Sequence, residues 1–277
     1  MTAASESGMV CVMTNKPFFT RDGAQGAFLP TPAANGPWDP KSLHGRVIVG
    51  LFASVIEQRH STDEFVPARL TVDMFRLPGF APIEIKSRIV RDGLRIRVAD
   101  AEFFSGGVSM ARASCQLLRK TQNSEGQVWS PPNWDVPAPA EIPVPTDPRL
   151  GMNGKWTTRP IVGAMGTVGP RRLWMSEVRD LVEDTPLTPF VRVAVAADYA
   201  SPFANAGSQG LGYINSDVTL YLHRLPATEW IGFEVVNHHA TDGIAIGECY
   251  LYDERGPIGT STVAALAQRK PAAKPQP

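Results

Sequence analysis

The sequence has few cysteines, no long apolar run and no excess of charge of either sign. Its three cysteines, Cys11, Cys115 and Cys249, include no close pair, which argues against both a disulfide framework and a zinc site. Basic and acidic side chains number 27 each, so the net charge gives no support for nucleic-acid binding. No segment approaches the ~18 apolar residues of a membrane span. The N-terminus also lacks the apolar core of a signal peptide. We therefore expect a cytoplasmic protein, with residues 1–15 as a loose leader.

The common cofactor-binding and nucleophile motifs are also missing. The chain contains no P-loop, no Gly-rich fingerprint after a strand, no GxSxG elbow and no metal-ligand spacing. We therefore expect neither a metal site nor a resident cofactor.

The sequence predicts one long apolar helix. Apolar residues recur at helical spacing through Val47, Leu51 and Val55, each with a second apolar residue beside it, and no proline interrupts them. Ser42 is the expected N-cap. Such a helix is apolar over most of its surface, so other structure must wrap around it.

Four strands follow between residues 67 and 119. Turn signals separate them at Pro78-Gly79, Asp92-Gly93 and Gly106-Gly107. Apolar and polar residues alternate within each strand, which is typical of an antiparallel sheet with one covered face. A hairpin is expected before the helix, around Phe18-Phe19 and Phe28-Leu29.

The second half repeats this plan. A helix is predicted over 187–199, with strands at about 212–224, 229–241, 244–253 and 257–268. The letters themselves repeat: Thr71 and the Arg-Leu-Pro at 76–78 match Thr219 and 224–226, and Asp92-Gly93 matches Asp242-Gly243. The period of about 150 residues is too long for a solenoid, so two copies of one domain are fused.

A proline-dense stretch separates the two copies. Residues 121–150 cannot continue a sheet ladder and are predicted to be an extended linker, with Trp129 and Trp134 against the protein surface. The predicted domains are therefore residues 16–120 and 151–270, followed by a tail at 271–277. The predicted fold class is α+β.

Two tandem sheets, each wrapped around a helix, form the double hotdog architecture. The segments HGRVIVGLF (44–52), RLTVDMFRLP (69–78), SDVTLYLHR (216–224) and GPIGTSTV (256–263) carry a resemblance to the TesB-type acyl-CoA thioesterases and their thioesterase-like relatives. The resemblance runs over residues 20–268. It implies hydrolysis of an acyl-CoA or acyl-carrier thioester, with coenzyme A present only as part of the substrate. It also implies a homo-oligomer.

The same resemblance implies candidate catalytic residues. In the family an Asp, a Ser or Thr and a Gln position and polarise a water. The matching positions here hold Asp217, His238 and Ala264, so one residue of the three is retained. A carboxylate at Asp217 is the expected base and His238 its helper. Thr241, close to His238 in the sequence, is a candidate for contact with the substrate or the oxyanion.

Other candidates concern the thioester carbonyl and the CoA phosphates. His44-Gly45 opens the long helix, where related single-hotdog enzymes carry an HGG segment, and free N–H groups at a helix start can polarise a carbonyl. The alternative is a packing histidine before a helix. Arg95 and Arg97 share a strand face and suit phosphate groups, although a solvated sheet face explains them as well.

Three functions remain open from the sequence. The first is a thioesterase that uses Asp217. The second is a hotdog hydratase or dehydratase, in which a histidine and an aspartate move the proton. The third is an acyl-CoA-binding or scaffold protein without catalysis, which the alanine at position 264 favours.

Overall fold

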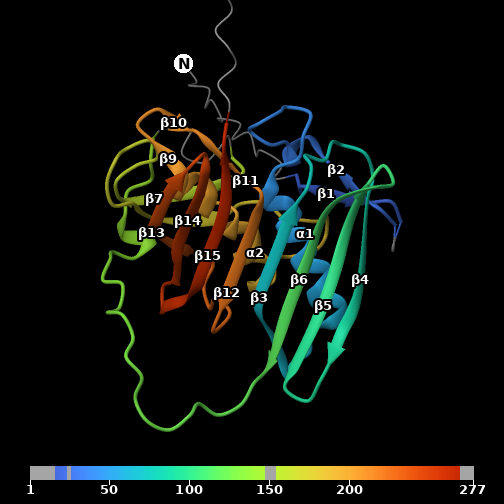
Figure 1. Cartoon of the computed structure of the whole chain (residues 1–277), viewed down its shortest axis with the longest axis horizontal. Helices are drawn as coiled ribbons and strands as arrows, with labels where there is room; N and C mark the ends of the chain where they lie inside the picture. Colours follow the sequence, from blue (N-terminus) through green and yellow to red (C-terminus); the bar gives the residue numbers. More distant parts are fainter. Residues whose placement is uncertain (1–15, 24–25, 147–153, 269–277) are drawn as a thin grey trace, which may run out of the picture.

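The computed structural model describes residues 16–23, 26–146 and 154–268. The predicted leader (1–15) and tail (271–277) lie outside the described residues. Each half carries one long buried helix region and a run of antiparallel strands, and Figure 1 shows the strands of both halves side by side in front of α1 and α2. The prediction of a double hotdog is confirmed.

The first half contains the predicted hairpin, the helix and four long strands. Their bounds are β1 (Phe19–Arg21), β2 (Phe28–Pro30), η1 (Pro32–Ala34), α1 (Gly45–His60), β3 (Phe65–Met74), β4 (Ile83–Asp92), β5 (Ile96–Ser105) and β6 (Val108–Arg119).

The second half adds short strands around the same plan. Its elements, with one turn of helix in the linker, are η2 (Pro139–Glu141), β7 (Trp156–Val162), β8 (Arg172–Glu177), α2 (Pro189–Ala197), α3 (Ala200–Asn205), β9 (Ala206–Gly207), β10 (Gly210–Leu211), β11 (Tyr213–Asn215), β12 (Asp217–Leu222), β13 (Ile231–Thr241), β14 (Ile244–Asp253) and β15 (Gly256–Ala267).

The two halves join into one continuous sheet. Its strand order is β1-β2-β4-β5-β6-β3-β12-β15-β14-β13-β8-β7, so β3 and β12 meet at the centre. Thr71 and Thr219, which match in the sequence repeat, are direct cross-strand partners there, and their hydroxyl oxygens lie 3.3 Å apart. A pseudo-two-fold axis therefore passes between these two threonines.

Helix α1 is the buried centre of the first half. Its residues from Arg46 to Ile56 are all buried, as the all-round apolar pattern predicts. The expected N-cap is wrong, because His44 caps the helix and its Nδ1 faces the Arg46 N–H at 3.4 Å. Ser42 lies two residues earlier and donates to the Asp39 carbonyl. The loop thus places a titratable ring at the start of α1.

Helix α2 packs directly against α1. A Cβ at Gly50 would lie 2.4 Å from Cγ2 of Val195, so glycine permits this approach. Thr188 caps α2, and Pro189 stands in its first turn, where a missing N–H is harmless. The helix ends at Ala197, whose carbonyl accepts a hydrogen bond from the buried Ser261 hydroxyl. The chain turns there, and Asp198 follows directly.

The linker is attached to the second half by one of its two tryptophans. Trp134 stacks on Tyr252, with ring centroids 4.3 Å apart, and contacts Trp174 edge to face. Gly232 leaves the space for it, since a Cβ there would lie 2.2 Å from the indole. Trp129, by contrast, is 84% exposed, so the prediction that it lies against the surface is wrong.

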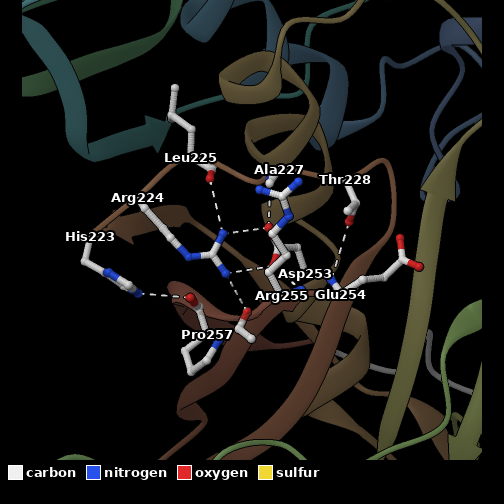
Figure 2. Close-up of polar contacts among 10 residues, drawn as sticks. His223, Arg224, Leu225, Ala227, Thr228, Asp253, Glu254, Arg255 and Pro257 are labelled. Atoms are coloured by element: carbon white, nitrogen blue, oxygen red, sulfur yellow. Dashed lines mark hydrogen bonds and ion pairs between the residues drawn. The ribbon is translucent and has the colours of Figure 1, made fainter.

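A partly buried ion pair fixes the loop after β12. Figure 2 shows Arg224 donating to both carboxylate oxygens of Asp253. These two bonds are 2.6 and 2.7 Å long, and Arg224 also donates to the Gly256 carbonyl. The same carboxylate accepts backbone N–H bonds from Ala227 and Arg255. These contacts outweigh the effect of burial and lower the pKa of Asp253. Arg224 of the repeated Arg-Leu-Pro segment therefore has a structural role.

Candidate active site

A cavity of about 820 Å³ opens where the two halves meet, at the start of α1. Most of its wall is apolar, and its buried apolar lining consists of Leu43, Ile48, Trp156, Leu173, Tyr199 and Phe203. Three polar side chains of the lining contact one another, namely His44, Asp198 and Asn215. An apolar chamber with a few convergent polar groups is the usual form of a small-molecule site.

The carboxylate of Asp198 lies directly on the N-terminus of α1. A Cβ at Gly45 would be 2.9 and 3.0 Å from its two oxygens, so only glycine fits beneath it. Asp198 is buried, and it comes from the end of α2, in the other half of the chain. The N-terminus of a helix stabilises a negative charge through its dipole and its unpaired N–H groups. The same N–H groups are suited to a carbonyl oxygen that gains charge.

His44 lies beside this carboxylate. Its Nδ1 is 3.6 Å from Oδ2 of Asp198 and its ring packs edge to face on Trp156. Burial lowers the pKa of His44, and the positive charge of Arg46 lowers it further, while Asp198 opposes the shift only in part. The imidazole is therefore neutral at neutral pH.

Asn215 fixes the other oxygen of Asp198. Its side-chain amide donates to Oδ1 at 2.9 Å and also to the Asp217 carbonyl at 3.1 Å. Asn215 ends β11, directly before β12, so the central strand of the second half holds the amide in place. Asp198 is thus held from two sides by residues 44 and 215.

A buried ion pair supports this arrangement from behind. Arg46 pairs with Glu177, both side chains are almost completely buried, and the guanidinium lies 4.0 Å from the centre of the Trp156 ring. Burial lowers the pKa of Arg46 to about 9. Position 46 is where the single-hotdog segment has its second glycine. In this chain an arginine there links α1 to β8 and to the cavity wall.

Asp217 lies outside this cavity lining. Its Oδ1 accepts the Ala264 N–H at 2.6 Å, and its backbone pairs with Asp73 of β3. Its neighbour Val218 is fully buried against the helices, so Asp217 projects to the other, outer face of the sheet. Burial raises the pKa of Asp217, and the nearby Asp73 adds to this shift.

His238 lies on the inner face, at a distance from Asp217. It pairs with Gly247, where a Cβ would contact Asn205 of α3, and its Nδ1 lies 2.9 Å from the Asn205 side-chain oxygen. Burial lowers its pKa. Strands β15 and β14 separate β12 from β13. The structure therefore does not bring the predicted pair Asp217 and His238 together.

The remaining candidates are spread over the molecule. Arg97 donates to Asp92 and to the His60 carbonyl at the C-terminal end of α1, roughly 20 Å along the helix from Gly45. Arg95 is exposed just before β5, and Thr241 is exposed at the tip of the β13–β14 hairpin. Of the residues expected from the sequence, only His44 and Gly45 line the cavity.

The sequence reasoning missed Asp198 and Asn215. One signal was present, because Asp198 is the only acidic residue between Leu187 and Ala206, in an otherwise apolar segment. A carboxylate at the end of a buried helix needs a partner or a function. For Asn215 no local signal exists.

No metal site competes with this assignment. Among residues 16–23, 26–146 and 154–268, no group of three or more His, Cys, Asp or Glu side chains is placed to hold a metal ion. In the same part of the chain, no helix is long and apolar enough to cross a membrane.

Comparisons with known proteins agree on the family and the fold. Residues 34–118 match the model of the acyl-CoA thioesterase N-terminal domain, and residues 133–266 match that of the C-terminal domain. No curated protein gives a significant match by sequence.

Several solved structures are similar in fold. The tesB protein of Mycobacterium avium subsp. paratuberculosis has a TM-score of 0.68 at 12% identity, over 91% of this chain and 96% of its own. A hot dog fold protein of unknown function from Alicyclobacillus acidocaldarius gives 0.70 at 17%, over 92% and 96%. Acyl-CoA thioesterase II TesB2 of Mycobacterium marinum gives 0.62 at 16%, over 83% and 91%.

Proposed function

Because the chain belongs to the acyl-CoA thioesterase family through both of its halves, we propose that it hydrolyses an acyl-CoA thioester in the cavity at the start of α1. One observation carries the proposal: the Asp198 carboxylate lies on the helix N-terminus inside an apolar chamber. A base and a set of N–H donors therefore face the same space, as hydrolysis of a thioester requires.

In the proposed reaction Asp198 is the base. It takes a proton from a water molecule whose oxygen attacks the thioester carbonyl carbon. The Gly45 N–H at the start of α1 stabilises the charge that forms on the carbonyl oxygen, since the Arg46 and Val47 N–H groups donate to His44. The C–S bond then breaks, the thiolate of coenzyme A takes up a proton from Asp198, and the free carboxylic acid leaves.

Two neighbours serve as positioning residues. Asn215 holds Oδ1 of Asp198, which leaves Oδ2 beside the neutral His44 to receive the proton. Protonation of His44 would pair the carboxylate with a cation and weaken it as a base. The apolar wall holds the acyl chain. The position of this carboxylate favours Asp198 over Asp217 for the role of base.

The experiment is release of free thiol from a panel of acyl-CoA substrates of increasing chain length. We expect turnover by the wild-type chain and its loss in Asp198→Asn. A folded wild-type chain that releases no thiol from any member of the panel overturns the proposal.

A second function deserves a parallel assay because of the contact between His44 and Asp198. Hydration of an enoyl thioester, or its reversal, needs a histidine and an acid that move one proton. An enoyl-CoA substrate separates the two reactions, since hydration removes its conjugated absorbance without releasing thiol. Homo-oligomerisation and a cytoplasmic location stay predictions.

A further inference from the structure

The mouth of the cavity is surrounded by exposed apolar side chains. We call this group the collar; it consists of Trp38, Phe75, Leu77, Met165 and Leu266. All five line the cavity, and each is between 37% and 54% exposed. They come from four separate segments of both halves, so the folded chain gathers them around one opening.

Such a group is unusual on a protein surface. Single exposed apolar residues are ordinary, whereas a contiguous exposed patch marks an interaction site. Here the patch lines the same cavity as the buried apolar wall residues. A partner that covers the collar would therefore be in contact with the chamber itself.

The charges near the collar are mainly positive. Arg76 stands between Phe75 and Leu77, is exposed and also lines the cavity, and Lys41 is exposed in the facing loop, which also holds Asp39. Aromatic and aliphatic side chains flanked by cations suit an anionic lipid surface.

We propose that the collar docks this chain on anionic lipid surfaces, from which an acyl chain enters the cavity directly. The use of that cavity for an acyl chain rests on the proposed function; the docking itself does not. The Trp38 indole and the Phe75 ring enter the boundary between headgroups and acyl chains, while Arg76 contacts lipid phosphates.

The test uses the full chain and vesicles, without substrate. Sedimentation is compared for vesicles of phosphatidylcholine alone and of phosphatidylcholine mixed with phosphatidylglycerol. We expect binding to the mixed vesicles that weakens as salt is added, because exposed charges are screened. The variant Phe75→Ser/Leu77→Ser should lower the partition coefficient at least about tenfold, since two large apolar contacts are lost.

A matched control removes two apolar residues elsewhere that are even more exposed than Phe75 and Leu77. Leu94 is 78% exposed at the β4–β5 turn, and Trp129 is on the linker. The variant Leu94→Ser/Trp129→Ser should bind vesicles like the wild type. Brominated lipid should quench fluorescence of the wild type, and this quenching should fall in Trp38→Phe.

The vesicle experiment tests the docking proposal independently of the hydrolysis assay. Wild-type protein that ignores anionic vesicles overturns the docking proposal, and so does an equal loss of binding in both double variants. Binding of an acyl carrier protein through the collar, without vesicle binding, overturns it as well. Thiol release from a short-chain acyl-CoA, measured without vesicles, tests the proposed function independently.

Discussion

Replacing Asp198 by asparagine is the sharpest test of the proposed chemistry. The amide has nearly the same shape as the carboxylate, and its oxygen can still accept the hydrogen bond of Asn215. The change removes only the charge and the ability to take a proton. A positioned general base contributes about 10²- to 10⁴-fold, so we expect kcat/KM to fall by about 10³-fold, or roughly 4 kcal/mol of barrier.

The measurement is the release of coenzyme A, followed with a thiol-reactive chromophore. The thiols of Cys115 and Cys249 do not react with the chromophore, because both are buried. Burial raises the pKa of Cys115 to about 12 and shifts that of Cys249 in the same direction. A thermal melt of each variant shows whether the fold is kept.

The matched control is Asp217→Asn. It makes the same chemical change at the position expected from the resemblance. That position lies on the outer face of the sheet, where the carboxylate accepts the Ala264 N–H. We expect its kcat/KM to stay near the wild-type value. If Asp217→Asn abolishes turnover while Asp198→Asn keeps it, the argument from the cavity is refuted.

Four further predictions follow from the geometry. Activity should fall when His44 is protonated, which happens below the ordinary histidine pKa of about 6.5 because burial lowers the pKa of His44. A pH profile of kcat/KM checks this. The variant His44→Gln should lose the acid limb of that profile. Asp253→Asn should lower the free energy of unfolding by about 2–3 kcal/mol, since Arg224 loses its partner. Because the pKa of Asp253 is lowered in the folded chain, its carboxylate stabilises the fold above its usual pKa, and this stabilisation is lost as the pH falls through the pKa of the folded state. The free energies of unfolding of wild type and variant should therefore converge at low pH. Gly50→Ala should destabilise the chain by about 1–3 kcal/mol in urea, because its Cβ overlaps Val195. One acyl-CoA or inhibitor should bind per chain by calorimetry, although the fold is duplicated.

The fold could be predicted from the sequence because the patterns that indicate its helices and strands are local. Strict alternation placed β4 to β6, turn residues separated them, and an uninterrupted apolar period placed α1. The repeat of Thr71 at Thr219 then indicated the duplication. That these two threonines face each other across the centre of one sheet follows from long-range pairing, which no local pattern encodes.

The candidate site was harder to predict from the sequence because its residues come from distant segments. His44 and Asp198 come from different halves of the chain and meet only because α1 and α2 pack against each other. The face on which Asp217 lies could nevertheless be predicted from the sequence. Val218, Leu220 and Leu222 form the core-facing set of β12, so the alternation itself puts Asp217 on the opposite face.

The two helix starts related by the pseudo-two-fold axis are not equivalent. The axis relates the start of α1, with Gly45 beneath the carboxylate of Asp198, to the start of α2. There Pro189 has no N–H to offer a carbonyl oxygen. The Thr188 hydroxyl donates to Glu57 at the C-terminal turn of α1, and burial raises the pKa of that carboxyl. The second helix start therefore lacks the donor that a thioester needs at that position. In the proposed reaction each half therefore supplies one part of a single site, since the start of α1 would give the donor and the end of α2 the base.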